Sequence, residues 1–588
     1  MAGGLAPLAA EEITRLVQVA LGQAPAEVVL RGVRVVDVFR ESVGLPTSLA
    51  LTGERIASLG PEQPGWVGPE TTVIEAGGLF CLPGLIDAHT HLDSIFQLAA
   101  YAPHALAGGN TTAVSETAMI AGAWGAAGVR HFLAEARAMP LRIFHTTPSL
   151  VPPFPDLETS AGLSSEEILR LLDDPLCVGV GETYWPAVID GDPRVAPQFA
   201  AALARGKRLE GHAAGARGPR LTAYAAAGIG DCHEAITGEE ALERLGLGLA
   251  VQVREGFVRR EMAQVVPALR DLPRTSEVML VSDLAPPEWI LDEGPLLPLL
   301  RQAVELGVAP ARAVAWLSLN PARYFGLEGL GAVAPGWGAD LVLVEDLTSF
   351  RVRQVWLGGR QVADADGYQG PELSYQYPAQ ARETLRCPAP TPSDFHLPAP
   401  GPTARVRVVQ VAGGTITKGS EAELAVKDGQ VPPDPAQDVV KMAVIHRHAP
   451  DGGRALGFAR GWGLRQGALA TSLVWDTCNL FVLGTSEAEM ARAAGRLKEL
   501  GGGFVVVAGE QILAELPMPL AGVISELSLP EIHQAIGDIE GALHGLGCPL
   551  PRPFLTAQTF LFTGLPFWRL TDRGLVDVRS RQFLEVLL

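Results

Sequence analysis

The chain has 588 residues, a formal net charge of −19 and a pI near 5.1, and 47% of its residues are hydrophobic. At about 150 residues per domain, this length predicts roughly three or four domains. An acidic surface repels phosphate backbones, so the composition argues against nucleic acid as a partner and favours a small neutral or cationic substrate. The 6 cysteines form no CxxC pair. Their scatter argues against a disulfide framework or a thiolate zinc site and favours a reducing, cytoplasmic compartment.

The N-terminal segment predicts a short amphipathic helix rather than a signal peptide. Glu11 and Glu12 interrupt it, and no basic region precedes it. No apolar run in the chain reaches the length of about 18 residues that a membrane span requires. We therefore expect no membrane partner.

Two groups of β-type segments flank a long middle region. The alternating pattern occurs in residues 26–39, 48–60 and 71–84, and it returns in 331–347 and 352–367. We expect one small β-sandwich domain, built from residues 1–80 and 329–370 at both flanks of an insertion.

The middle region, residues 81–328, alternates short apolar strands with helices. After an opening strand near 80–88, further strands are expected in 111–116, 141–149, 177–184, 208–215, 228–234, 249–256 and 278–284. Helices are expected in 164–174 and 237–248, with Ser164 and Thr237 as N-caps. About eight strands alternating with helices over about 240 residues is the pattern of a (β/α)8 TIM-like barrel. Tandem doubly wound domains are the alternative.

The last part of the chain predicts a third unit. Residues 371–404 are rich in proline and predict a linker or a wrapping segment. From residue 405 to 588, strand and helix patterns resume and predict a separate C-terminal α/β domain.

Polar side chains follow the predicted barrel strands at their carboxyl ends, where the loops of such barrels carry the functional site. They are His89, His91, Glu182, His212, His233 and Asp283. Imidazoles and carboxylates are ligands for divalent metals, and residues i and i+2 of an extended chain point the same way. We expect one or two metal ions, with Glu182 able to bridge a pair.

The expected chemistry follows from these groups. A bound divalent metal lowers the pKa of water from about 15.7 toward 7 and so supplies hydroxide at neutral pH. Asp283 would take the proton and pass it to a leaving group, so that Asp283 and Glu182 are the catalytic candidates. The predicted reaction is metal-assisted hydrolysis at an sp2 carbon, either an amide or an amidine-like C–NH2.

Several motifs resemble the adenine deaminase family of the amidohydrolase superfamily. "PGLIDAHTHLDS" (83–94) is similar to its first-strand motif, and the similarity continues through 181–192, 206–218, 226–248, 319–327, 457–472, 516–526 and 570–578. The resemblance implies hydrolysis of adenine to hypoxanthine and ammonia at a binuclear centre of manganese or iron type, in a homodimer; the ligand set is also compatible with zinc. All six candidate ligands match by position. No lysine lies between 177 and 190, so Glu182 is the bridging candidate.

The chain departs from the family pattern in four places. An Asp-Pro-His-Glu motif is replaced by residues 116–119, and an Asp-Asp-Arg-His motif by residues 283–286, where only Asp283 remains. In the C-terminal domain the altered motifs lie at 446–448 and 475–479, where Trp475 and Cys478 replace histidines.

The residues expected around the ligands are thus more apolar in this chain than in the family motifs. We predict an aminohydrolase of adenine or of a related aminated heterocycle. A metal-dependent cyclic amide hydrolase and a non-catalytic ligand-binding relative are the alternatives.

Overall fold

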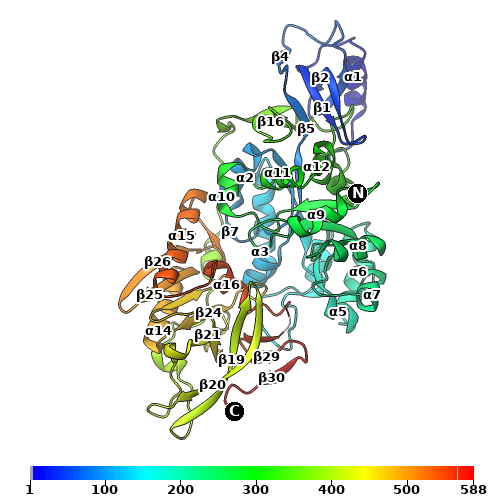
Figure 1. Cartoon of the computed structure of the whole chain (residues 1–588). Helices are drawn as coiled ribbons and strands as arrows, with labels where there is room; N and C mark the ends of the chain where they lie inside the picture. Colours follow the sequence, from blue (N-terminus) through cyan, green and yellow to red (C-terminus); the bar gives the residue numbers. More distant parts are fainter. Residues whose placement is uncertain (1–3, 566) are drawn as a thin grey trace.

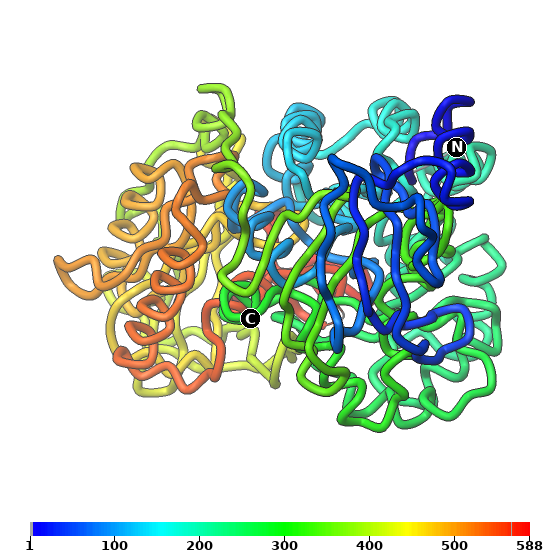
Figure 2. The backbone as a smooth tube through the Cα atoms, turned by 90° about the horizontal axis from the view of Figure 1, so that it is seen from above, coloured from blue at the N-terminus to red at the C-terminus, as the bar shows by residue number. Residues whose placement is uncertain are grey.

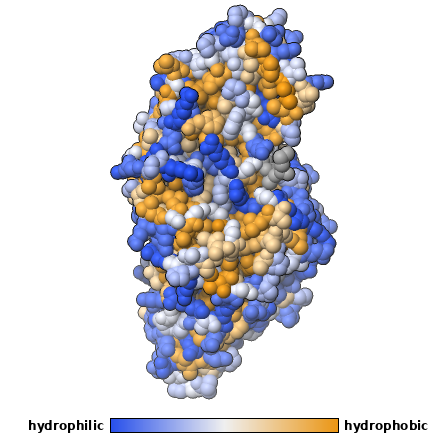
Figure 3. All heavy atoms as spheres, turned by 90° about the vertical axis from the view of Figure 1, so that its right-hand side faces the viewer, coloured by the Kyte–Doolittle hydropathy of each residue, from blue (hydrophilic) through white to orange (hydrophobic). Residues whose placement is uncertain are grey.

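A computed structural model describes residues 4–565 and 567–588. The chain folds into a small β domain at one end, a central barrel, and a C-terminal α/β domain packed against the side of the barrel (Figures 1 and 2). Within the described residues, no helix is long and apolar enough to cross a membrane. Hydrophobic and hydrophilic residues are interspersed on the face shown in Figure 3.

Strands from both flanks of the chain join one sheet at the N-terminal end of the molecule. The sheet contains β1 (Val28–Asp37), β2 (Ser42–Thr52), β3 (Arg55–Gly60), β4 (Thr72–Glu75), β5 (Phe80–Pro83), β15 (Leu341–Val344), β16 (Val352–Leu357), β17 (Arg360–Asp364) and β18 (Gly367–Tyr368). Helix α1 (Ala10–Ala20) precedes it. The antiparallel pairing of β5 with β15, Cys81 opposite Leu343, connects the two flanks. The small domain is therefore assembled from both sides of the barrel, as a single nine-stranded sheet.

The opening strand expected near 80–88 is divided into two. β5 belongs to the flanking sheet, whereas β6 (Leu85–Thr90) begins the barrel. Between them, a Cβ on Gly84 would lie 2.2 Å from Thr111 Oγ1. Only glycine fits where the chain passes between the two sheets, because a side chain would collide with the neighbouring strand.

Eight parallel strands form the barrel. β6 is followed by β8 (Asn110–Ser115), β9 (Arg142–Thr147), β10 (Cys177–Tyr184), β11 (Arg208–His212), β12 (Asp231–Cys232), β13 (Ala250–Arg254) and β14 (Val278–Val281). They form ladders of five and three strands. Single hydrogen bonds close the two gaps, from Gly230 N to Leu209 O at 3.0 Å and from Asp283 N to His89 O at 3.1 Å. The carboxyl ends of all eight strands consequently meet at one rim.

Helices surround the barrel between the strands. They are α2 (Leu98–Ala107), α3 (Ala118–Ala138), α4 (Ser165–Leu171), α5 (Trp185–Ile189), α6 (Val195–Ala204), α7 (Pro219–Ala226), α8 (Gly238–Gly246), α9 (Met262–Leu269), α10 (Pro287–Asp292), α11 (Leu297–Glu305), α12 (Pro310–Trp316) and α13 (Leu319–Phe325). Ser164 and Thr237 cap α4 and α8 as expected, each accepting a backbone N–H from the first turn.

The proline-rich segment packs against its neighbours. It contains two 3-10 turns, η1 (Ala379–Arg382) and η2 (Pro392–Phe395). Gln97 donates to Tyr375 O at 3.1 Å, and Tyr377 donates to Glu135 at 2.8 Å. These contacts hold the segment against the barrel helices.

The C-terminal domain is built on an eight-stranded sheet. Its strands are β19 (Thr403–Gly413), β20 (Ile416–Ala425), β21 (Val439–Ile445), β22 (Arg454–Arg460), β23 (Ala468–Thr471), β24 (Leu480–Gly484), β25 (Gly503–Ala508) and β26 (Gln511–Pro517). With it pack the 3-10 turn η3 (Pro435–Gln437), helices α14 (Glu487–Glu499), α15 (Leu529–Gly545) and α16 (Pro553–Thr559), and the small sheet of β28 (Trp568–Thr571), β29 (Gly574–Asp577) and β30 (Gln582–Leu584).

The barrel and the C-terminal domain share a core. β7 (Ile95–Phe96), from the loop after β6, pairs in parallel with β27 (Ile524–Ser525) of the C-terminal domain. Buried residues of α2 and α3 form one hydrophobic cluster with those of the C-terminal sheet, including Phe132, Leu473 and Phe504. Loops of the C-terminal domain are thereby fixed over the mouth of the barrel.

Gly122 in α3 is a point of close approach between these two parts. A Cβ at this position would lie 2.1 Å from Asp476 O. Gly122→Ala is therefore expected to lower the melting temperature and to displace the loop around Asp476, because that distance is far inside van der Waals contact. Gly495→Ala in α14 is the control: nothing lies within 4 Å of its Cβ, and we expect about 0.5–1 kcal/mol of stabilisation. Equal melting temperatures for the two variants would contradict the close contact.

Candidate active site

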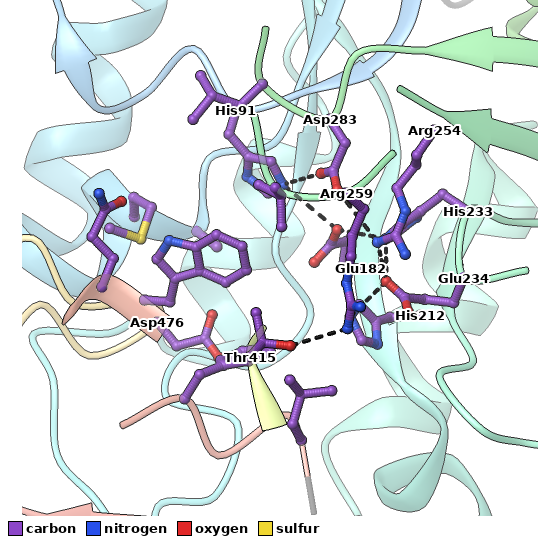
Figure 4. A pocket seen from close by; sticks show the side chains of 18 of the residues that line it. His91, Glu182, His212, His233, Glu234, Arg254, Arg259, Asp283, Thr415 and Asp476 are labelled. Carbon is purple, nitrogen blue, oxygen red and sulfur yellow. Dashed lines mark hydrogen bonds and ion pairs between the residues drawn. The ribbon is translucent and has the colours of Figure 1, made fainter. Parts of the chain in front are cut away.

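All six predicted ligands lie at the carboxyl rim of the barrel. Figure 4 labels all of them except His89. His91 and His233 lie one residue beyond β6 and β12, and Asp283 lies two residues beyond β14. The remaining three are within strands, namely His89 in β6, Glu182 in β10 and His212 at the end of β11. We call these six side chains the ligand cluster.

Glu182 lies at the centre of the ligand cluster. Its Oε1 is 3.0 Å from His89 Nε2, 3.6 Å from His91 Nε2 and 3.0 Å from His233 Nε2. Asp283 Oδ1 is 3.5 Å from His89 Nε2 and 3.2 Å from His91 Nε2. The donors form two groups that share Glu182, each with its atoms within 4.8 Å of one another: His89, His91, Glu182 and Asp283, and then Glu182, His212 and His233. This is the arrangement that a bridging carboxylate between two ions requires.

The ligand cluster fits divalent cations on chemical grounds. His89 Nε2 is buried and has no aligned hydrogen-bond partner among the described residues, and the same holds for His233 Nδ1. An unsatisfied buried polar group costs about 1–3 kcal/mol, and a coordinated cation removes that cost for a nitrogen that faces it. His89 Nε2, which faces Glu182 and Asp283, is such a nitrogen.

The electrostatics of the cluster favour bound positive charge. Burial by itself lowers the pKa of His89 and His91, but the carboxylates of Asp283 and Glu182 raise it well above its ordinary value. Burial raises the pKa of Glu182, yet the charge of His233 and the contacts of the surrounding imidazoles bring it well below the usual range. Burial likewise raises the pKa of Asp283, but its contacts with the two imidazoles and the Arg254 charge hold it well below its usual value. Glu182 and Asp283 are therefore both ionised, as carboxylate metal ligands must be.

Two further glutamates lie beneath the ligand cluster and were missed as functional residues by the sequence analysis. Glu116 accepts hydrogen bonds from Thr146 Oγ1 at 2.7 Å and from Glu182 N at 3.0 Å. Glu210 Oε2 lies 3.5 Å from His89 Nδ1. Burial raises the pKa of Glu116 to about 8 and that of Glu210 to about 7. These groups orient Glu182 and His89 from behind. For Glu210 the sequence offered one signal: it precedes His212 by two residues in a strand, so that both side chains lie on the same face.

A buried arginine, Arg254, contacts the ligand cluster through Asp283. Arg254 contacts Glu234 and lies 3.0 Å from Glu261 and 3.4 Å from Asp283 Oδ2. Burial raises the pKa of Glu234, but the Arg254 charge lowers it to about 2. Glu234 Oε1 in turn is 3.4 Å from His212 Nε2. The sequence analysis also missed Glu234 and Arg254, which lie within the predicted strands 228–234 and 249–256, close to their carboxyl ends.

Arg254→Met is expected to lower the free energy of unfolding by about 3–5 kcal/mol, because it leaves buried carboxylates without their counter-charge. Arg170→Met, which removes an exposed i,i+4 pair with Glu166, is expected to cost about 0.5 kcal/mol at most. Denaturant unfolding measures both. Similar losses would show that the Arg254 network contributes little to stability.

The ligand cluster opens into a pocket of about 750 Å³, part of it open to solvent. One wall comes from the barrel and the other from the C-terminal domain, including Thr415, Trp475, Asp476, Gln558, Phe562 and Leu565. Trp475 lies with its ring centroid 6.4 Å from that of His91 and 5.3 Å from that of Phe562. Aromatic walls of this kind suit a flat ring.

The departures from the family pattern are partly gathered in this pocket. Met119, Leu284 and Trp475 line it. Cys478 lies behind them and donates to Met119 O at 3.2 Å. These positions thus form an apolar wall beside the ligand cluster.

Barrel, rim ligands and pocket together define a hydrolase of the amidohydrolase class, and residues 80–362 match the model of the amidohydrolase family. Residues 414–582 match the adenine deaminase C-terminal domain. The chain is 37% identical to an adenine deaminase of Moorella thermoacetica over 592 aligned positions, which cover 99% of each protein. An adenine deaminase of Nitratidesulfovibrio vulgaris is 37% identical (97% of this chain, 98% of the relative), and one of Kosmotoga olearia 32% (98% and 99%). The chain belongs to the adenine deaminase family.

Proposed function

We propose that this enzyme hydrolyses the exocyclic C–NH2 bond of adenine, giving hypoxanthine and ammonia. The observation that carries the proposal is the meeting of four imidazoles and two carboxylates at one barrel rim, in two groups with donor atoms within 4.8 Å. The full-length similarity to adenine deaminases, at 32–37% identity, supports the same reaction.

We further propose a binuclear centre of manganese or iron type. His89, His91, Glu182 and Asp283 would hold one ion, and Glu182, His212 and His233 the other; zinc suits the same ligands. Bound there, the ions supply the acidity that lowers the pKa of water toward about 7.

Asp283 is the residue that moves protons in this proposal. Its Oδ1 faces the cluster, while Oδ2 lies 3.4 Å from Arg254 Nη1. Burial would raise the pKa of Asp283, but the neighbouring imidazoles and Arg254 keep it well below its usual value. An ionised carboxylate in this position accepts a proton from the attacking water and delivers it to the departing amino nitrogen. The products then balance the reaction of adenine with one water.

The experiment is an ammonia-release assay on the purified, manganese-loaded protein, with metal analysis on the same sample. Adenine is expected to release ammonia in parallel with the appearance of hypoxanthine, and removal of the metal by a chelator is expected to abolish both. Absence of ammonia from a panel of aminopurines and pterins, with opening of cyclic amides instead, would overturn the proposal.

Other proposals rest on the sequence. We propose a cytoplasmic homodimer that binds neither nucleic acid nor membrane, supported by its net charge of −19 and by 6 cysteines, each free and buried. Ile13 and Val17 on α1 and Leu21 directly after it form an exposed apolar stripe, which is a feature of association surfaces. Light scattering of the full chain tests the dimer.

We also propose domain boundaries near residues 80, 328, 370 and 404.

A further inference from the structure

A loop of the C-terminal domain, residues 474–479, enters the mouth of the barrel; we call it the pocket loop. Trp475 and Asp476 of this loop line the pocket. Asp476 and Cys478 have φ angles of +65° and +54°, in the left-handed region that non-glycine residues rarely adopt. Backbone of this kind persists only where its surroundings hold it.

Buried hydrogen bonds hold the pocket loop. Arg447, which is fully buried, donates to Cys478 O at 2.9 Å and to Thr384 Oγ1 at 2.9 Å. Asn479 Nδ2 donates to Thr159 O at 2.9 Å, a contact to the barrel. The position of Asp476 is therefore set by the fold and not by a flexible loop.

The Asp476 carboxyl faces the pocket beside the ligand cluster. It is only 8% exposed, and Tyr184 donates its hydroxyl to the two carboxyl oxygens at 2.9 and 3.1 Å. Tyr184 follows Glu182 by two residues in β10, and its ring lies edge-on to His212 with centroids 4.7 Å apart. Figure 4 shows Asp476 across the pocket from Glu234 and Arg254.

Asp476 has acceptor capacity left over. Among the described residues it makes no ion pair, and a carboxylate offers about four lone-pair sites. Burial raises its pKa to about 7, with the Tyr184 hydrogen bond acting in the opposite direction. A buried acceptor with one hydroxyl donor gains from a further donor.

The chemistry of adenine supplies one such donor. With its amino-bearing carbon at the ligand cluster, the base has a single N–H outside the reacting group, on the imidazole ring; its other ring nitrogens are acceptors. In a nucleoside, the sugar occupies that ring nitrogen. We propose that Asp476, positioned by Tyr184, accepts the imidazole N–H of the base and so selects free bases over N9-substituted ones. This inference rests on the proposed function.

The test compares adenine with 9-methyladenine in the metal-loaded full chain. Wild type is expected to prefer adenine. Asp476→Ala is expected to lower kcat/KM for adenine by about 10- to 100-fold, mainly through KM, because it leaves the N–H of the base without its buried hydrogen-bond acceptor. The same change is expected to leave 9-methyladenine turnover and bound metal unaltered. Tyr184→Phe, which removes only the positioning hydroxyl, is expected to reduce the preference less.

Asp572→Asn is the matched control. Asp572 accepts hydrogen bonds from Thr159 at 3.0 Å and from Asn479 at 3.3 Å, so it contacts the pocket loop from outside the pocket. The Asp572→Asn protein is expected to prefer adenine over 9-methyladenine to the same extent as wild type. An equal loss in Asp572→Asn, or equal losses for both substrates in Asp476→Ala, would overturn the inference and indicate a structural role.

Failure of the proposed function is separable from failure of this inference. If adenine releases no ammonia, calorimetric binding of hypoxanthine and of 9-methylhypoxanthine replaces turnover. Weaker binding of hypoxanthine alone in Asp476→Ala supports the N–H contact. Unchanged binding of both compounds contradicts it.

Discussion

Glu182→Gln is expected to reduce ammonia release by about 10³-fold or more and to lower the bound metal per chain. Glu182 Oε1 belongs to both donor groups and lies within 3.6 Å of three imidazole nitrogens. Glutamine keeps the shape of the side chain but loses the charge that would compensate a bound divalent cation. Steady-state kinetics and elemental analysis of the same preparation measure the two effects.

Glu158→Gln is the control for a buried glutamate outside the ligand cluster. Burial raises the pKa of Glu158 to about 8, so its side chain is largely neutral at pH 7, and it accepts from Thr563 Oγ1 at 2.8 Å. Glutamine can accept the same bond, and we expect activity and metal content to remain near those of wild type. Full metal content and full activity in the Glu182→Gln protein would show that Glu182 is not a metal ligand.

Asp283→Asn is expected to lower kcat by about 10³- to 10⁴-fold, the upper part of the range for loss of a positioned general acid–base. KM is expected to change little, because Asp283 acts on the reacting atoms. Asparagine retains an oxygen toward His91, so most of the metal should remain bound. Single-turnover kinetics on protein of known metal content separate proton transfer from metal loss.

Glu255→Gln provides a rim control for this variant. Glu255 is buried near the same rim and accepts from Met262 N at 3.1 Å, a bond that glutamine preserves. Its kcat is expected to equal that of wild type. A comparable fall in both variants, or a fall in Asp283→Asn explained entirely by lost metal, would rule out proton transfer by Asp283.

Asp283 also has an unusual backbone. Its φ is +46° and that of Leu284 is +77°. A Cβ on Gly256 would lie 1.9 Å from Ser282 O, so this turn is pressed against the end of β13. Strain of this kind at a rim residue is stored by the surrounding fold and fixes the direction of the carboxylate.

The apolar wall of the pocket affects how a substrate can be recognised. Met119, Leu284 and Trp475 line the pocket, at positions where the resemblance described above implies polar groups. We therefore expect the pocket to offer fewer hydrogen bonds to the ring of a bound base. The polar groups of the C-terminal wall, above all Asp476, then carry more of the recognition. A hydrogen-bonding site discriminates strongly against ligands that leave its buried groups unpaired.

Local sequence patterns determined the ligand cluster. His-x-His after a buried strand, and one polar residue at the end of each of several later strands, place their side chains on one rim, because parallel strands align their carboxyl ends. The register within each strand is a period of two, which a sequence displays directly. For this reason His89, His91, Glu182, His212, His233 and Asp283 could be predicted together.

Only the tertiary structure decided what surrounds the cluster. Tyr184 meets Asp476 across 292 positions of the chain, and the pocket loop reaches the barrel through the core shared by α2, α3 and the C-terminal sheet. The Arg254 ion pairs and the glutamates behind His89 and Glu182 likewise depend on how separate strands and loops pack. Such contacts arise from the packing of distant segments and leave no periodic signal in the chain. The sequence therefore determined the ligand cluster, whereas the fold decided the pocket into which this cluster opens.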